Sequence, residues 1–111
     1  MKRFLFICSQ NRLRSPTAEQ IFAGHPGIEV DSAGINHDAE NPLTGELVAW
    51  ADAIFVMERA HRNKVQRHFR RHLRGQPIVC LDIPDNYAFM EDNLIQLLQV
   101  RMVRHLPHAT L

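Results

Sequence analysis

The sequence predicts a single α/β domain over residues 1–111, a three-layer sandwich with a four-stranded parallel sheet between two layers of helices. Short apolar runs alternate along the chain with segments of helical spacing, and this alternation is typical of parallel sheets covered on both faces. The chain has 111 residues, which corresponds to one domain of roughly 100–150 residues.

Four short segments, three of them continuously apolar, are predicted to form strands. They comprise residues 4–7, 28–31, 53–57 and 78–81. The run at 53–57 is continuously apolar, which is typical of a strand buried on both faces of a sheet. Polar segments, several of them rich in glycine, asparagine or proline, follow these runs, so we expect loops at residues 8–14, 32–42 and 82–89.

Helical signals fill the spaces between these strands. The first helix is expected to begin at the Ser15-Pro16 pair, where the serine hydroxyl caps free backbone N–H groups, and to close at Gly24. Residues 43–50 predict a short second helix. Residues 58–74 predict a basic, amphipathic third helix whose apolar side chains lie four residues apart. The last helix is marked by Leu94, Leu98, Met102 and Leu106.

Composition narrows the function classes. The chain is 45% hydrophobic and 23% charged, which excludes a disordered tail, a collagen-like chain and a disulfide miniprotein. Its 13 basic and 12 acidic residues give no global charge argument for a nucleic-acid partner. It has 2 cysteines, and the apolar run after Lys2 and Arg3 is too short for a secretory leader or a membrane span. We therefore expect a cytoplasmic protein with reduced cysteines and no membrane partner.

The segment from Cys8 to Arg14 carries the clearest chemistry. It is a short loop between a strand and a helix N-terminus, so its backbone N–H groups can converge on an anion. Arg14 can bind two phosphate oxygens at once, and Asn11 tolerates the left-handed backbone that a tight loop requires. Cys8 starts this loop, where positive potential favours a thiolate, and Ser15 can donate its hydroxyl to the sulfur. A thiolate that faces a bound phosphoryl group is a nucleophile.

A structural role for Cys8 is the alternative. Cysteine often serves as a small buried apolar residue at the end of a strand, and five residues between a cysteine and an arginine form a weak pattern alone. The context favours the catalytic interpretation, because a strand precedes Cys8, a helix start follows Arg14, and Asn11 lies mid-loop.

The loop resembles the phosphate-binding loop of the low-molecular-weight protein tyrosine phosphatases. The matching segments occur in the family's order over most of the chain. They are residues 7–16 (ICSQNRLRSP), 30–34 (VDSAG), 51–58 (ADAIFVME) with His61, and 82–87 (DIPDNY). The resemblance implies a parallel sheet with strand order 2-1-3-4, a Cys8 nucleophile, Arg14 as the phosphate-binding side chain, and a Ser15 that assists the thiolate. It also implies that Asn11 holds the shape of the loop.

The resemblance also identifies a general acid. The family uses an aspartate that is followed by a proline and an aromatic residue, and Asp85 with Tyr87 matches best. A carboxylic acid beside the leaving oxygen can donate a proton and later act as a base on water. Asp82, three residues earlier, is the competing candidate, and an ordinary solvated turn is the alternative for both.

Substrate contacts are expected from the rest of the loop and from Tyr87. The loop residues are Ser9, Gln10, Asn11, Arg12, Leu13 and Ser15. Tyr87 would flank an aromatic leaving group, and Arg12 at the rim would favour acidic substrates. A half-buried amphipathic ring and a solvated charge are the respective alternatives.

Four differences mark this chain as a short, divergent member of the resembled family. Gln10 replaces a usual glycine, Leu13 replaces a second loop cysteine, and Asn86 replaces the proline after the general acid. The segment between Gly34 and Ala51 is also shorter than the family's substrate-shaping region.

The sequence therefore predicts a phosphomonoester hydrolase, of the protein-tyrosine-phosphatase type, that works through a cysteinyl-phosphate. Its partner would be a phosphotyrosine protein or a small aryl phosphate, and no cofactor is expected because loop amides and Arg14 supply the electrostatics. An arsenate reductase is one alternative, although Cys80 in a strand is a poor second cysteine. A non-catalytic module that binds phosphate or nucleic acid through the basic residues 59–74 is the other.

Three remaining features predict no further chemistry. His68 and His72 lie one helical turn apart without a third ligand, so we expect no metal. Trp50 and Cys80 are expected in the core, and the basic segment is most simply a solvated helix face.

Overall fold

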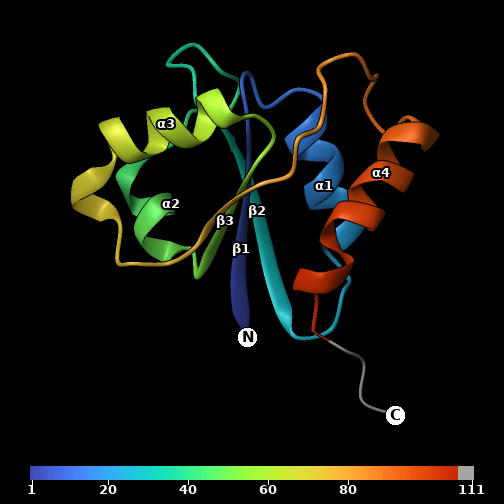
Figure 1. The fold of residues 1–111 in the computed structure, drawn as a ribbon, viewed down its shortest axis with the longest axis horizontal. Coiled ribbons are helices and arrows are strands. Elements are labelled where there is room, and N and C mark those ends of the chain that lie inside the picture. The colour runs from blue at the N-terminus through green and yellow to red at the C-terminus, as the bar shows by residue number, and fades with distance from the viewer. Residues whose placement is uncertain (108–111) are drawn as a thin grey trace.

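The structure is a computed structural model that describes residues 1–107. Its four strands form one parallel sheet in the order β2-β1-β3-β4. The strands are β1 (Lys2–Cys8), β2 (Ile28–Gly34), β3 (Ala53–Val56) and β4 (Ile78–Cys80). The fold class and strand order expected from the sequence are therefore confirmed. Strand β1 lies between β2 and β3 (Figure 1). Its last residue, Cys8, therefore lies at the carboxyl edge of the sheet.

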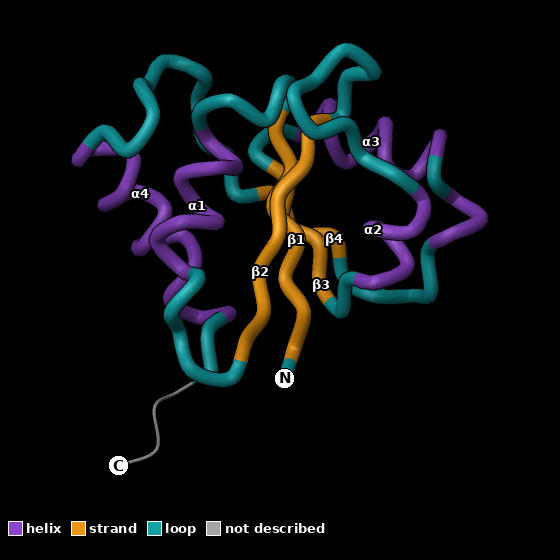
Figure 2. The backbone as a smooth tube through the Cα atoms, turned by 180° about the vertical axis from the view of Figure 1, so that it is seen from behind, coloured by secondary structure: helices purple, strands orange, loops and turns teal. Residues whose placement is uncertain are grey.

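Helices cover both faces of this sheet. They are α1 (Arg14–Phe22), α2 (Gly45–Trp50), α3 (Arg59–His68) and α4 (Asp92–Met102), with short 3-10 turns η1 (Arg70–His72) and η2 (Val103–His105). Helices α1 and α4 lie on one side of the sheet, and α2 and α3 lie on the other (Figure 2). Among the residues described, no helix has both the length and the apolar composition that crossing a membrane requires.

Alternation along β1 divides the core into two clusters. Phe4 and Phe6 face the cluster that contains α1 and α4 residues, whereas Leu5 and Ile7 face the cluster beneath α2 and α3. Successive side chains of a strand point to opposite faces, so a central strand with helices on both sides must be apolar at every position. The Phe6 ring lies 5.5 Å from the Phe55 ring of β3, centroid to centroid.

Strand β2 and the basic helix have different bounds from those predicted from the sequence. Strand β2 continues to Gly34, three residues past the expected end, because residues 32–34 pair with Phe6, Ile7 and Cys8 of β1. The basic helix expected over residues 58–74 spans only Arg59–His68, and the chain then forms η1. Phe69 and Leu73 still pack against the second core cluster, so the apolar spacing correctly predicts the buried face although the helix is shorter.

The predicted capping of α1 by Ser15 is wrong. Leu13 is the N-cap residue and provides no side-chain cap, and Ser15 lies inside the helix. The Ser15 hydroxyl contacts Cys8 and Asn11 instead of free backbone N–H groups. The helix also ends at Phe22, with Ala23 as its C-cap, before Gly24 is reached.

Candidate active site

A cavity of about 190 Å³ opens where β1 meets α1, at the carboxyl edge of the sheet. Its lining comes from the β1–α1 loop (residues 9–13), the two residues that flank this loop, and one residue that follows β4. The lining residues are Cys8, Ser9, Gln10, Arg12, Leu13, Arg14 and Asp85. All seven were candidate site residues from the sequence, and the fold brings them together in one cavity.

The sulfur of Cys8 is buried and lies in a chain of hydroxyl and amide groups. Cys8 is only 3% exposed, and its Sγ lies 2.9 Å from Ser15 Oγ. The Asn11 amide donates to Ser15 Oγ and to Ser32 Oγ, each at 2.9 Å. Because Ser15 Oγ accepts from Asn11, its own proton can be donated to the sulfur at 2.9 Å or to the Ala33 carbonyl at 3.5 Å. A hydroxyl that donates to sulfur stabilises a thiolate.

Asn11 also sets the shape of the β1–α1 loop. Its φ angle is 56°, in the left-handed region that asparagine tolerates better than most residues. The loop also needs a glycine at position 34, because a β-carbon there would lie 2.9 Å from Ser9 O and would collide with Ala39. The loop therefore depends on a left-handed residue within it and on a residue without a side chain beside it.

The Arg14 guanidinium is buried and held by three oxygen acceptors. Its Nη1 donates to the Ile83 carbonyl at 2.7 Å and to Glu58 Oε2 at 2.6 Å, and its Nε lies 3.6 Å from Asp85 Oδ1. The arginine side chain is 2% exposed. Planar guanidinium groups suit several in-plane acceptors at once, so these contacts fix the orientation of the group in the wall of the cavity.

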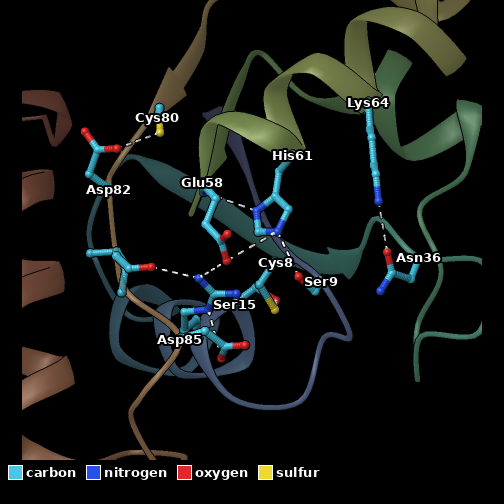
Figure 3. Close-up of polar contacts among 12 residues, drawn as sticks. Cys8, Ser9, Ser15, Asn36, Glu58, His61, Lys64, Cys80, Asp82 and Asp85 are labelled. Carbon is cyan, nitrogen blue, oxygen red and sulfur yellow. Dashed lines mark hydrogen bonds and ion pairs between the residues drawn. The ribbon is translucent and has the colours of Figure 1, made fainter.

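The two candidate acids have different surroundings. Asp85 lines the cavity with Cys8, and its side chain is 60% exposed. Asp82 lies next to Cys80, whose thiol donates to Asp82 Oδ1 at 3.3 Å, and it is absent from the lining of this cavity (Figure 3). The geometry therefore supports Asp85 over Asp82 as the acid that acts on a group bound above Cys8.

Other candidate residues lie at the rim or beyond it. Gln10 and Arg12 reach carboxylates of the 35–43 segment, with Gln10 donating to Asp38 at 3.4 Å and Arg12 lying 3.3 Å from Glu40. Tyr87 is half-buried against the core cluster of α1 and α4 and does not line the cavity. The structure therefore does not bring Tyr87 to the site in the way the sequence analysis expected.

Two residues of the site received no role in the sequence analysis. Glu58, directly after β3, pairs with Arg14, and buried His61 on α3 lies 2.9 Å from Ser9 Oγ through its Nε2 atom. The Glu58 backbone N–H donates to His61 Nδ1 at 3.2 Å. Figure 3 shows His61 between Glu58 and Ser9, next to Cys8. The usable signal for Glu58 was its position, since a carboxylate that directly follows a buried parallel strand lies at the functional edge of the sheet.

The pKa of His61 is lowered to about 4. Burial is the largest cause, the charges of Arg14 and Lys64 act in the same direction, and Glu58 and Asp85 oppose them. The imidazole is therefore neutral near neutral pH. Because Nδ1 accepts the Glu58 N–H, the ring proton lies on Nε2 and is donated to Ser9 Oγ. His61 thus links the start of α3 to the first residue of the β1–α1 loop.

This lowered pKa predicts a pH-dependent stability that His61→Asn removes. From about pH 6.5, the ordinary histidine pKa, down to about pH 4, the unfolded chain binds a proton that the folded chain does not. The free energy of unfolding should therefore fall with pH across this window, by about 2–3 kcal/mol from His61. An asparagine oxygen can still accept the Glu58 N–H but does not titrate.

Urea unfolding at pH 7, 5.5 and 4 tests this prediction. The difference in the free energy of unfolding between wild type and His61→Asn should decrease as pH falls. A constant gap would contradict the assignment.

Cys80, His68 and His72 lie outside the first cavity. Cys80 is half-buried on β4, and burial raises the pKa of its thiol. Within residues 1–107, no group of three or more histidine, cysteine, aspartate or glutamate side chains is placed to hold a metal ion. His68 lies in α3 and His72 in η1.

No protein-family model matches this sequence, and no curated protein is significantly similar to it. Solved structures do match. The tyrosine phosphatase Wzb from Escherichia coli K30 is 25% identical with a TM-score of 0.74, over 94% of this chain and 95% of that chain. The YwlE arginine phosphatase from Geobacillus stearothermophilus is 21% identical with a TM-score of 0.71, over 98% and 100%.

A third solved structure carries the name of the resembled family. The low molecular weight protein tyrosine phosphatase SP-PTP from Streptococcus pyogenes is 13% identical with a TM-score of 0.76, over 96% of this chain and 95% of that chain. The resemblance carried by residues 7–16 and by the later motifs is thus confirmed: the chain has the fold of the low-molecular-weight protein tyrosine phosphatases.

Proposed function

We propose that this protein is a phosphoric monoester hydrolase of the protein-tyrosine-phosphatase type. The observation that carries the proposal is the single cavity of about 190 Å³ whose wall contains the Cys8 thiol, the buried Arg14 guanidinium and the Asp85 carboxyl group. These are a nucleophile, a dianion-binding group and an acid, which together are sufficient for phosphoryl transfer through a covalent intermediate.

In the first step, the Cys8 thiolate attacks the phosphorus of a bound phosphomonoester. A sulfur–phosphorus bond forms as the bond to the leaving oxygen breaks, and Asp85 donates its proton to that oxygen. Arg14 and the amides of the β1–α1 loop bind the equatorial phosphoryl oxygens, where negative charge is concentrated. Ser15 stabilises the thiolate before attack and again when the sulfur leaves.

In the second step, water attacks the phosphorus of the cysteinyl-phosphate. Asp85, now a carboxylate, accepts the water proton, the sulfur–phosphorus bond breaks, and Cys8 leaves as the thiolate. The products are inorganic phosphate and the regenerated enzyme. The nucleophile must stay in the thiol or thiolate form, which suits a cytoplasmic protein because thiols persist in reducing compartments.

The substrate in this proposal is a phosphotyrosine protein or a small aryl phosphate. The solved structures of similar fold include two named tyrosine phosphatases and one named arginine phosphatase, so all three support hydrolysis of a phosphorylated protein. An arsenate reductase gains no support, since that chemistry relays electrons through further cysteines and Cys80 bonds to Asp82 outside the cavity lining.

The proposal is tested by hydrolysis of para-nitrophenyl phosphate near pH 6, with Asp85→Asn compared with Asp82→Asn. Wild type should turn over and be blocked by vanadate. Loss of a general acid typically costs about 10²–10⁴-fold, so Asp85→Asn should lower kcat by at least about 10²-fold. Asp82→Asn should stay within about twofold of wild type, because Asp82 bonds to Cys80 outside the cavity lining. A greater loss of kcat in Asp82→Asn than in Asp85→Asn would identify Asp82 as the general acid. A wild-type protein without activity would contradict the proposed function.

A further inference from the structure

A second cavity, of about 350 Å³, lies beside the β1–α1 loop, between α3 and the 35–43 segment. Two backbone hydrogen bonds join this segment to the active-site edge, from Ile35 N to Cys8 O at 2.9 Å and from Asn36 N to Ser9 O at 3.1 Å. Lys64 extends from α3 toward Asn36, on the side of the site where Ser9 lies (Figure 3). The second cavity therefore adjoins the first across two pairs of hydrogen-bonded residues, Ile35 with Cys8 and Asn36 with Ser9.

The lining of this second cavity combines an apolar wall with cationic and hydrogen-bonding groups. Ile35, Leu43 and Phe69 supply the apolar part, and Lys64, His37 and His68 supply the polar part. The Lys64 ammonium makes a long contact of 3.5 Å to Asn36 Oδ1. The carboxylates of the same segment, Asp38 and Glu40, turn toward Gln10 and Arg12 and do not line the cavity.

The surroundings strengthen this positive character. The sequence has no acidic residue between Glu58 and Asp82, and the exposed basic side chains of α3 and η1 include Arg59, Arg67, Arg70 and Arg71. Residues 59–74 contain a single phenylalanine, tyrosine or tryptophan, Phe69, which is half-buried against the core. Binding of single-stranded nucleic acid uses exposed aromatic platforms, so this surface fits an acidic peptide better.

We propose that the second cavity is a subsite for an acidic side chain of a protein substrate, one that lies within a few residues of the phosphorylated residue. The inference rests on the proposed function, because a phosphoryl group in the first cavity is the anchor from which the flanking chain would cross the 35–43 segment to reach the second. An extended peptide advances about 3.3–3.6 Å per residue, so the neighbouring cavity is within reach of its next side chains. Lys64 would pair with the carboxylate, and the imidazoles would donate hydrogen bonds to it.

Binding of two phosphotyrosine peptides to the Cys8→Ala protein tests this subsite without turnover. The peptides differ only in their flanks, which carry glutamates in one and glutamines in the other. Fluorescence anisotropy at about 0.15 M salt, where long-range attraction is largely screened, gives the two Kd values. We expect the acidic peptide to bind about fivefold more tightly, and Lys64→Gln in the same background to remove most of that preference, as for a partly exposed ion pair.

Arg71→Gln is the matched control, because it removes the same charge from an exposed residue that does not line the cavity. The proposal requires that Arg71→Gln keep the preference for the acidic peptide. Equal losses in both variants would show general attraction by the basic surface and overturn the subsite. Equal affinity of the two peptides would overturn the subsite alone, whereas binding of neither peptide would overturn the proposed function as well. Displacement of the acidic peptide by single-stranded DNA in a Lys64-dependent manner would assign the cavity to nucleic acid instead.

Discussion

Cys8→Ser is expected to abolish hydrolysis of para-nitrophenyl phosphate, with a loss in kcat of about 10⁴-fold or more, as when other covalent nucleophiles are removed. A serine hydroxyl is not ionised near pH 6, so it lacks the thiolate that attacks phosphorus. The contacts of Ser15 with the sulfur at 2.9 Å and with Asn11 at 2.9 Å stabilise an anion and cannot remove the proton of a serine. Acid quenching of the wild-type reaction followed by mass spectrometry should detect a phosphoryl group on the peptide that contains Cys8.

Cys80→Ser is the matched control for this change. Cys80 is half-buried, bonds to Asp82 and is absent from the lining of the first cavity. Because burial raises the pKa of this thiol, it is protonated near pH 6 and is not a competing nucleophile. Its variant should keep kcat within about twofold of wild type. Loss of activity in Cys80→Ser, or a phosphoryl group found on the Cys80 peptide, would contradict the assignment of the nucleophile.

The fold could be predicted because the central strands are buried on both faces. Such strands must be apolar throughout, so the runs that became β1 and β3 stood out as short apolar segments between polar ones. The end of β2 did not, because Ser32, Ala33 and Gly34 resemble a turn by composition. They are extended because β1 offers backbone partners for each of them, and pairing of this kind depends on the assembled sheet.

The site could be predicted as far as its residues lie close together in the sequence. Cys8 and Arg14 flank a short loop between a strand and a helix, so their side chains had to meet near one anion-binding centre. The partners of these residues come from other elements. Glu58 follows β3 and His61 lies on α3, and their contacts with Arg14 and Ser9 depend on how α3 is placed against the loop. Tyr87 shows the reverse case, since this residue is suited to the site by type but packs half-buried against the core cluster of α1 and α4.

Arg14→Lys should be the most damaging change that keeps the charge of the site. The guanidinium donates to Ile83 O at 2.7 Å and to Glu58 at 2.6 Å, and it lies 3.6 Å from Asp85. An ammonium group is a single point of charge without the planar fork that binds two phosphoryl oxygens. We expect kcat/KM to fall about 10³-fold, equivalent to about 4 kcal/mol of transition-state stabilisation. Vanadate inhibition should weaken in parallel.

Arg62→Lys is the control, because Arg62 donates to the Ile78 carbonyl at 2.6 Å and does not line the cavity. Near wild-type kcat/KM in Arg14→Lys would mean that loop amides alone bind the phosphoryl group, and that Arg14 serves to join the β1–α1 loop to Glu58 and to the segment after β4.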